Sequence, residues 1–67
     1  MAARTTRRKI VWHLNSACDH CDRIMRHLQQ VGDFSAGRIP PVEESLPELV
    51  EAVVLIRGGL QSLRNRI

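Results

Sequence analysis

Apolar side chains recur every three or four residues along two stretches of the chain, and this pattern constrains the fold most strongly. Spacing that alternates between three and four residues keeps one side of an α-helix turned towards a partner helix. The pattern therefore predicts two long helices that pack against each other. The first stretch contains Val11, Leu14, Cys18, Cys21, Met25 and Leu28, and the second contains Leu46, Leu49, Val53, Ile56, Leu60, Leu63 and Ile67.

The break between the two stretches contains residues that favour helix ends. Gly32 is a suitable C-cap, and Ser45 followed by Glu48 has the spacing of an N-terminal capping box. We therefore expect a helix from about residue 6 to 31, a connection over 32–44 and a second helix from about 45 to 66. Residues 1–6 are expected to form a flexible basic arm. The 67 residues then make a single all-α domain, a two-helix antiparallel hairpin.

Antiparallel folding would match the two apolar stretches residue by residue. Met25 is expected opposite Val53, and Cys21 opposite Ile56. Further apolar residues such as Ile10 widen the stripe beyond what one partner helix covers. Chains below roughly 70–80 residues are usually stabilised by disulfides, metals or oligomerisation. We therefore expect a homodimer in which two hairpins form a four-helix bundle.

The charge balance and the expected architecture allow a nucleic-acid partner. Ten Lys and Arg against seven Asp and Glu give a net charge of +3, which permits anionic partners. The expected architecture resembles that of the plasmid copy-number regulator ROP, a dimeric helical hairpin that binds RNA loops. This similarity is one of architecture only and assigns no role to any residue. RNA or DNA binding is therefore an alternative function, although Trp12 and Phe34 are fewer aromatics than base-stacking modules use.

Cys18 and Cys21 form a CxxC pair, which can be half of a zinc site or a redox pair. The chain has no second CxxC to complete a zinc site. Both cysteines fall on the apolar stripe, where a free cysteine acts as a small buried hydrophobe. We interpret them as core residues and expect no metal or cofactor. A zinc-bridged dimer, in which each copy donates one CxxC, is the alternative.

The best candidates for partner binding are basic residues next to the chain's only tryptophan. Cations at the start of a helix oppose its dipole, which suggests that they serve a contact outside the helix. Three histidines recur every seven residues, about 10.5 Å apart along a helix and too far for one metal ion. The predicted partner-binding residues are Arg4, Arg7, Arg8, Lys9, Trp12, His13, His20, His27 and, on the outer face of the second helix, Leu55.

Several classes of function are disfavoured by what the sequence lacks. No apolar stretch approaches the roughly 20 residues of a membrane span, and the absence of a secretory signal with only two cysteines favours the cytoplasm. No set of acid, base and nucleophile converges, so we do not expect an enzyme. The sequence favours a small regulator, adaptor or inhibitor that binds another protein. Chains this short are common among bacteriophage and mobile-element accessory proteins, which suggests a host protein as the target.

Overall fold

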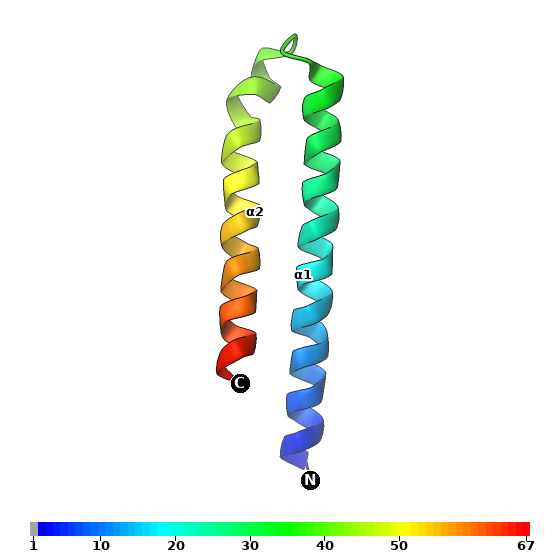
Figure 1. The fold of residues 1–67 in the computed structure, drawn as a ribbon, viewed down its shortest axis with the longest axis vertical. Helices are drawn as coiled ribbons and strands as arrows, with labels where there is room; N and C mark the ends of the chain where they lie inside the picture. Colours follow the sequence, from blue (N-terminus) through cyan, green and yellow to red (C-terminus); the bar gives the residue numbers. More distant parts are fainter. Residues whose placement is uncertain (1) are drawn as a thin grey trace.

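The chain folds into a hairpin of two antiparallel helices (Figure 1). The computed structural model describes the backbone of residues 2–67 and the side chains of residues 5–67. Helix α1 spans Ala2–Ser35 and helix α2 spans Pro40–Arg66. Together they form a rod with dimensions of 56 × 16 × 13 Å. The predicted all-α helical hairpin is confirmed.

Helix α1 extends beyond the predicted bounds at both ends. It begins at Ala2, so the stretch expected to be a flexible arm is helical from that residue on. It also continues past Gly32, and the prediction of Gly32 as the C-cap is wrong. The helix ends where Ala36 and Gly37 adopt positive φ angles of 47° and 74°, the left-handed conformation that commonly terminates helices.

Gly32 instead lies inside α1, where it allows the two helices to approach each other. A Cβ atom added to Gly32 would lie 3.0 Å from Cδ2 of Leu46 in α2. This distance is tighter than ordinary van der Waals contact, so a side chain here would have to displace Leu46. The glycine therefore serves close packing beside the connection.

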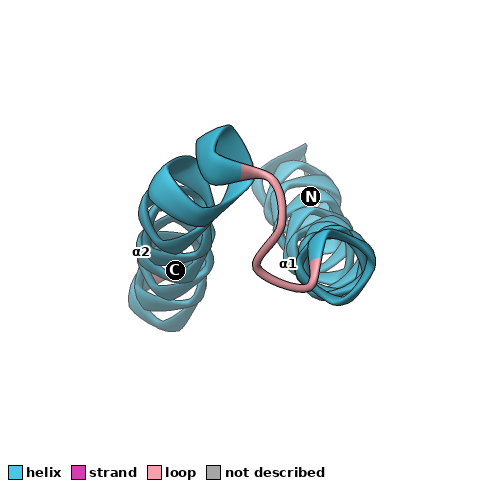
Figure 2. Ribbon diagram, turned by 90° about the horizontal axis from the view of Figure 1, so that it is seen from above, coloured by secondary structure: helices cyan, strands magenta, loops and turns pink. Residues whose placement is uncertain are grey.

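Helix α2 begins five residues earlier than predicted. Pro40 and Pro41 occupy its first positions, where a missing backbone donor costs nothing. The residue before them, Ile39, has an extended backbone and makes no side-chain cap. Pro47 then falls inside the helix and leaves the carbonyl of Glu43 without its usual donor. Figure 2 shows the first turn of α2 displaced from the axis of the rest of the helix.

Ser45 is therefore an exposed residue inside α2, and its predicted capping role is wrong. Replacing Ser45 with alanine should leave the midpoint of urea unfolding unchanged or raise it slightly. Alanine has the higher helix propensity, by up to about 0.5 kcal/mol. Ser35→Ala is the control, because it removes a buried hydroxyl that bonds across the helices and should cost about 1 kcal/mol. A loss of that size at Ser45 instead would restore its capping role.

The buried core between the helices is small. Among the described side chains, the buried apolar ones are Leu14, Cys21 and Val53, with exposed fractions of 8%, 6% and 9%. Other members of the predicted stripe are only partly covered by the opposite helix. These half-buried residues are Val11, Cys18, Met25, Leu28, Leu46 and Leu60.

Helix α2 is rotated relative to the prediction. Leu49, Ile56 and Leu63 are 51%, 57% and 41% exposed, so the prediction that they pack against α1 is wrong. Val50 and Arg57, the residues that follow Leu49 and Ile56, are less exposed and take their places. The residues of α2 that lie against α1 are again spaced by four and three residues in turn, so they satisfy the same periodicity. These residues are Leu46, Val50, Val53, Arg57 and Leu60.

Contacts between the helices confirm the predicted antiparallel register. Arg57 bonds Asp22 near the middle of the hairpin, and Leu46 lies against Gly32 near the connection. These two contacts place Met25 level with Val53, as predicted. At the closed end, next to the connection, the Ser35 hydroxyl donates a 3.2 Å hydrogen bond to Oε1 of Glu43. At the open end, where the chain termini lie, Nε of Arg7 donates a 2.6 Å hydrogen bond to the backbone oxygen of Ile67.

Candidate protein-interaction surfaces

One side of the hairpin carries an uncovered apolar surface, here called the broad face. Its residues recur every seven positions on both helices, and all but Leu63 directly precede a half-buried residue between the helices. In an antiparallel pair of helices, residues that lie one position before the inward-facing residues are on the same side of the pair in both helices. The row on α1 and the row on α2 therefore form one surface. Apart from the half-buried Ala17, the members are 41–57% exposed. The broad face consists of Ile10, Ala17, Ile24 and Val31 of α1 and Leu49, Ile56 and Leu63 of α2.

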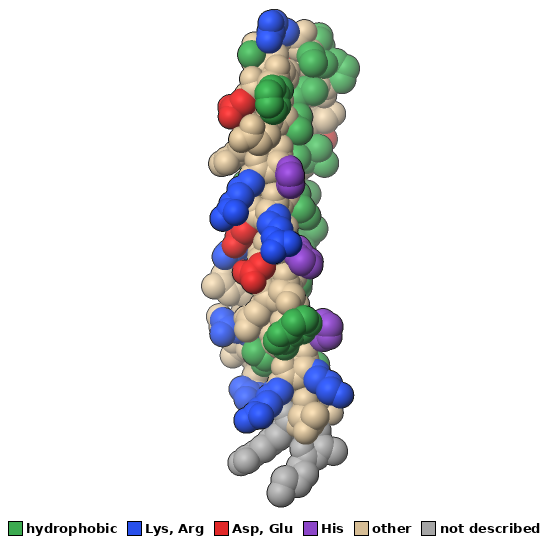
Figure 3. Space-filling model, turned by 90° about the vertical axis from the view of Figure 1, so that its right-hand side faces the viewer, with side chains coloured by type: hydrophobic (Ala, Val, Ile, Leu, Met, Phe, Trp, Pro, Cys, Tyr) green, Lys and Arg blue, Asp and Glu red, His purple; other side chains and the backbone are tan. Residues whose placement is uncertain are grey.

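Histidines border the broad face along α1. His13, His20 and His27 are exposed and precede Ala17, Ile24 and Val31 by four residues, which places each histidine beside its apolar neighbour. Figure 3 shows the three histidines in a column next to hydrophobic side chains along one edge of the molecule. Within the described part of the chain, no group of three His, Cys, Asp or Glu side chains could hold a metal ion.

Small residues border the same face along α2. Ser45, Ala52 and Gly59 precede the three apolar members of α2 by four residues, and all three are exposed. A Cβ atom added to Gly59 would have no neighbour within 4 Å, and the same holds for Gly58. Neither glycine therefore serves close approach between α1 and α2. They lie against open space on the outside of the hairpin.

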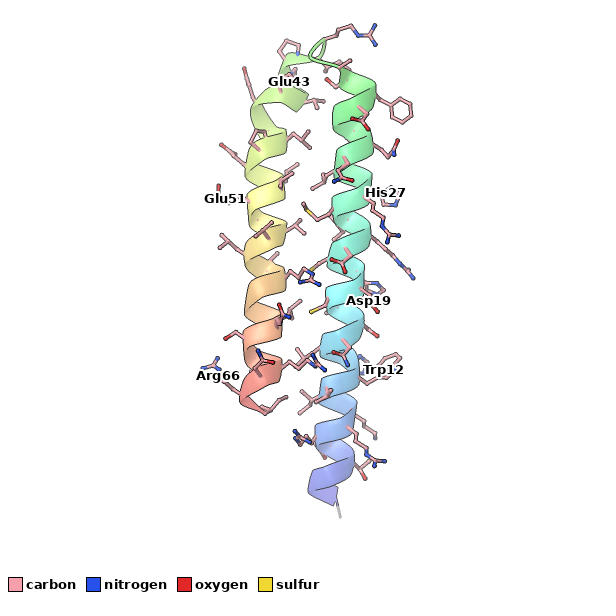
Figure 4. The ribbon with its side chains drawn as sticks, in the orientation of Figure 1. Trp12, Asp19, His27, Glu43, Glu51 and Arg66 are labelled. Atoms are coloured by element: carbon pink, nitrogen blue, oxygen red, sulfur yellow. The ribbon has the colours of Figure 1, made fainter. Side chains whose placement is uncertain are left out.

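The predicted basic and aromatic residues near the start of α1 separate into two groups. Trp12 is 63% exposed and points away from α2 (Figure 4), with its ring edge-on to His13 at a centroid distance of 4.9 Å. Arg8 and Lys9 precede Trp12 by four and three residues, so they share its surface. Arg7 instead binds the end of α2. The side chain of Arg4 lies outside the described residues.

The start of α1 at Ala2 also changes the electrostatic argument for these cations. Arg7, Arg8 and Lys9 lie beyond the first turn, whereas the helix dipole acts mainly within that turn. The predicted conflict with the dipole is therefore wrong. The exposure of Trp12 now carries the argument for a contact surface, because a large indole in solvent leaves much apolar area uncovered.

Charges are distributed unequally between the two ends of the rod. In α2, the acidic residues all lie in the first half and the basic residues all lie in the second half. At the open end, the basic residues of α2 lie near the cations at the start of α1. At the closed end, the acidic residues of α2 lie near Asp33 of α1, and Arg38 in the connection is a cation at this otherwise acidic end. The acidic side chains of α2 are Glu43, Glu44, Glu48 and Glu51, and its basic ones are Arg57, Arg64 and Arg66.

An ion pair between the helices was not predicted. Nε of Arg57 lies 2.8 Å from Oδ1 of Asp22. The hydrogen bond and the negative charge of Asp22 raise the pKa of the Arg57 guanidinium. Both side chains are more than 40% exposed, so the pair contributes more to register than to stability. Helical spacing alone also allows Val50 and Arg57 to face α1. The prediction used Leu49 and Ile56 instead, because these residues are more apolar.

A second unpredicted contact joins the ends of the helices at the connection. Ser35 is 2% exposed, and its hydroxyl bonds the carboxylate of Glu43 in the first turn of α2. A negative charge at this position also suits the dipole of α2. The sequence feature that could have indicated this contact is an acidic residue, Glu43, that follows Pro40 and Pro41 in the first turn of α2.

The two cysteines lie between the helices and are free thiols. Cys21 is 6% exposed and Cys18 is partly exposed. Both belong to the stripe that faces α2 and not to the broad face. The packing supports their predicted role in the core of the hairpin.

Two further surface features lie outside the surfaces described above, one on each helix. An open depression of about 450 Å³ on α1 is lined by Arg23, Arg26, His27, Gln29 and Gln30. On α2, Leu55 is 68% exposed next to Val54, as expected for its outer position.

Compared with models of known protein families, with curated proteins and with solved structures, the chain gave no match. Within the described residues, neither helix is long and apolar enough to cross a membrane.

Proposed function

We propose that this chain is a small, non-enzymatic protein-binding module that acts as a homodimer and serves as a regulator, adaptor or inhibitor of another protein. One observation carries the proposal. Among the described side chains, twelve large hydrophobic ones are exposed, whereas only three apolar ones are buried. A soluble chain rarely leaves so much apolar surface uncovered unless other molecules contact it.

Seven of these twelve residues lie on two surfaces that can serve two different partners: six belong to the broad face, and Trp12 lies beside Arg8 and Lys9. The broad face is long and uncharged, which suits a second hairpin and would complete a four-helix bundle. The surface of Arg8, Lys9 and Trp12 combines cations with an exposed indole. Tryptophan and arginine are enriched among the residues that dominate binding energy at protein interfaces. This surface therefore suits an acidic patch on the target protein.

Affinity capture with the full chain tests the target surface. The immobilised parent chain should retain one specific protein from an extract of its native host. The variant Arg8→Glu/Lys9→Glu, which keeps Arg7 and its contact with Ile67, should lose that protein. Arg23→Glu/Arg26→Glu makes the same charge change elsewhere on α1 and should retain it. Equal retention by all three chains would contradict the assignment of this surface.

Nucleic-acid binding is the alternative, favoured by the cations at the open end. Phosphate contacts release counterions, so RNA or DNA affinity would fall steeply as salt rises. Titration of labelled RNA and DNA at several salt concentrations distinguishes the two functions. Binding that weakens with salt, and that both charge variants reduce to a similar extent, would replace the protein-binding proposal with this alternative.

A further inference from the structure

We propose that the broad face is the docking site for a second copy of this chain, and that the two hairpins dock antiparallel, with the open end of each over the closed end of the other. This inference rests on the proposed homodimer and specifies its surface and geometry. A two-fold axis in the interface, perpendicular to the long axis of the rods, relates the two copies. Each helix then packs antiparallel against its own equivalent.

The side of the rod that carries the broad face is large enough for a stable interface. The whole wider side measures 56 Å by 16 Å, on the order of 900 Å², and a standard interface buries roughly 800 Å² per partner. The exposed members of the broad face are uncharged aliphatic side chains on both helices. A face of this kind can meet its own copy without bringing like charges together.

The charge distribution selects the antiparallel arrangement. Docked antiparallel, the rods place Arg64 and Arg66 at the open end of one copy near Glu43 and Glu44 at the closed end of the other. A parallel arrangement would instead bring the two cationic ends together, including Arg8 of both copies. Like charges held close at an interface are unfavourable, and complementary ones favour association.

The side chains of α2 complement each other in the same arrangement. When the two-fold axis lies level with Val54, Leu49 comes opposite the partner's Gly59. Ile56 comes opposite the partner's Ala52. Each large side chain thus meets a small one, which lets the helix axes approach closely.

The same axis also suits α1. The register of the hairpin places Ile24 of α1 level with Val54 of α2, so Ile24 lies close to the axis. The small Ala17 then falls within the stretch of the partner's α1 that carries Val31 and Phe34. One rotation therefore brings apolar residues together along both helices.

Two adjacent glycines provide a matched test of this face. Gly59 lies beside the broad face and Gly58 does not, yet both have open space around them in one hairpin. Leucine at either position improves helix propensity, so neither substitution should unfold the helix. Gly59→Leu would fill the space that receives the partner's Leu49, whereas Gly58→Leu would not.

Sedimentation equilibrium, with far-ultraviolet circular dichroism to verify helix content, measures the outcome. The parent chain should be a dimer. Gly59→Leu should raise the dimer dissociation constant about 10- to 100-fold, and Gly58→Leu should change it by less than about threefold. A monomeric parent would refute the homodimer itself. A dimeric parent for which the two variants behave alike would refute only the broad face as its interface.

A charge swap tests the orientation. Arg64→Glu/Arg66→Glu should weaken an antiparallel dimer about tenfold, because it places glutamates near glutamates of the partner. It would tighten a parallel dimer by relieving repulsion at the open end. Adding Glu44→Lys, which leaves the contact between Glu43 and Ser35 in place, should recover part of the lost affinity. A tighter dimer for the first variant would overturn the antiparallel arrangement.

Discussion

Val53→Asp is expected to unfold the hairpin, whereas the same substitution at the next residue, Val54→Asp, should leave it folded. Val53 is 9% exposed and faces α1, and Val54 is 55% exposed. Aspartate at position 53 loses the apolar contact and places a second carboxylate between the helices, where it competes with Asp22 for Arg57. This should cost about 3–5 kcal/mol, close to the total stability expected of a chain this small. Helix content measured by circular dichroism in a urea titration gives both free energies of unfolding.

The matched pair of valines also tests the rotation of α2. Both substitutions change the same side chain in the same helix, so helix propensity contributes equally to each. The difference between them reports which side of α2 is turned towards α1. Loss of the fold with Val54→Asp and not with Val53→Asp would show that α2 presents its other side.

The hairpin and its register were predictable from the sequence, but the rotation of α2 was not. Periodicity identifies a helix with an apolar side, and the antiparallel match of two stripes sets their offset along the axis. In α2, however, two overlapping sets of residues satisfy the spacing. The set with Leu49 and Ile56 is more apolar, whereas the set with Val50 and Arg57 brings Arg57 to Asp22. Periodicity alone does not choose between them.

Competition between local signals explains the errors at the helix ends. Ser45 and Glu48 have the spacing of a capping box, but Pro40 and Pro41 are equally compatible with a first turn. The earlier start is accompanied by the contact between Glu43 and Ser35. At the end of α1, Gly32 could have adopted a left-handed conformation, but Ala36 and Gly37 do so instead. Tertiary packing of Leu46 against Gly32 keeps the glycine inside the helix.

The candidate surfaces were predictable only in part, because helical spacing shows which side of a helix a residue is on but not what the other helix reaches. Helical spacing was enough to place Leu55 outside the hairpin and to put the histidines on one side of α1. It could not show that Arg7 reaches the end of α2 while Arg8 and Lys9 share a surface with Trp12. That separation depends on where α2 ends relative to α1, which is a property of the packed hairpin.

Replacing both cysteines with alanine is expected to destabilise the hairpin without affecting partner binding. Cys18→Ala/Cys21→Ala should lower the free energy of unfolding by about 1–3 kcal/mol, because it removes side-chain volume from the contact between the helices. Cys21, the more buried thiol, should account for the larger share. Urea titrations of the two single variants and the double variant measure these contributions.

The reactivity of the thiols and the metal content distinguish a packing role from a zinc site. Cys18 should react faster than Cys21 with a thiol reagent in the folded protein, because Cys21 is covered by α2. Addition of a chelator should leave helix content unchanged. Stoichiometric zinc in the purified protein, together with loss of the fold on chelation, would instead favour a zinc-bridged dimer. In that case, two hairpins would have to turn their cysteine-bearing sides towards each other, which the broad-face dimer does not allow.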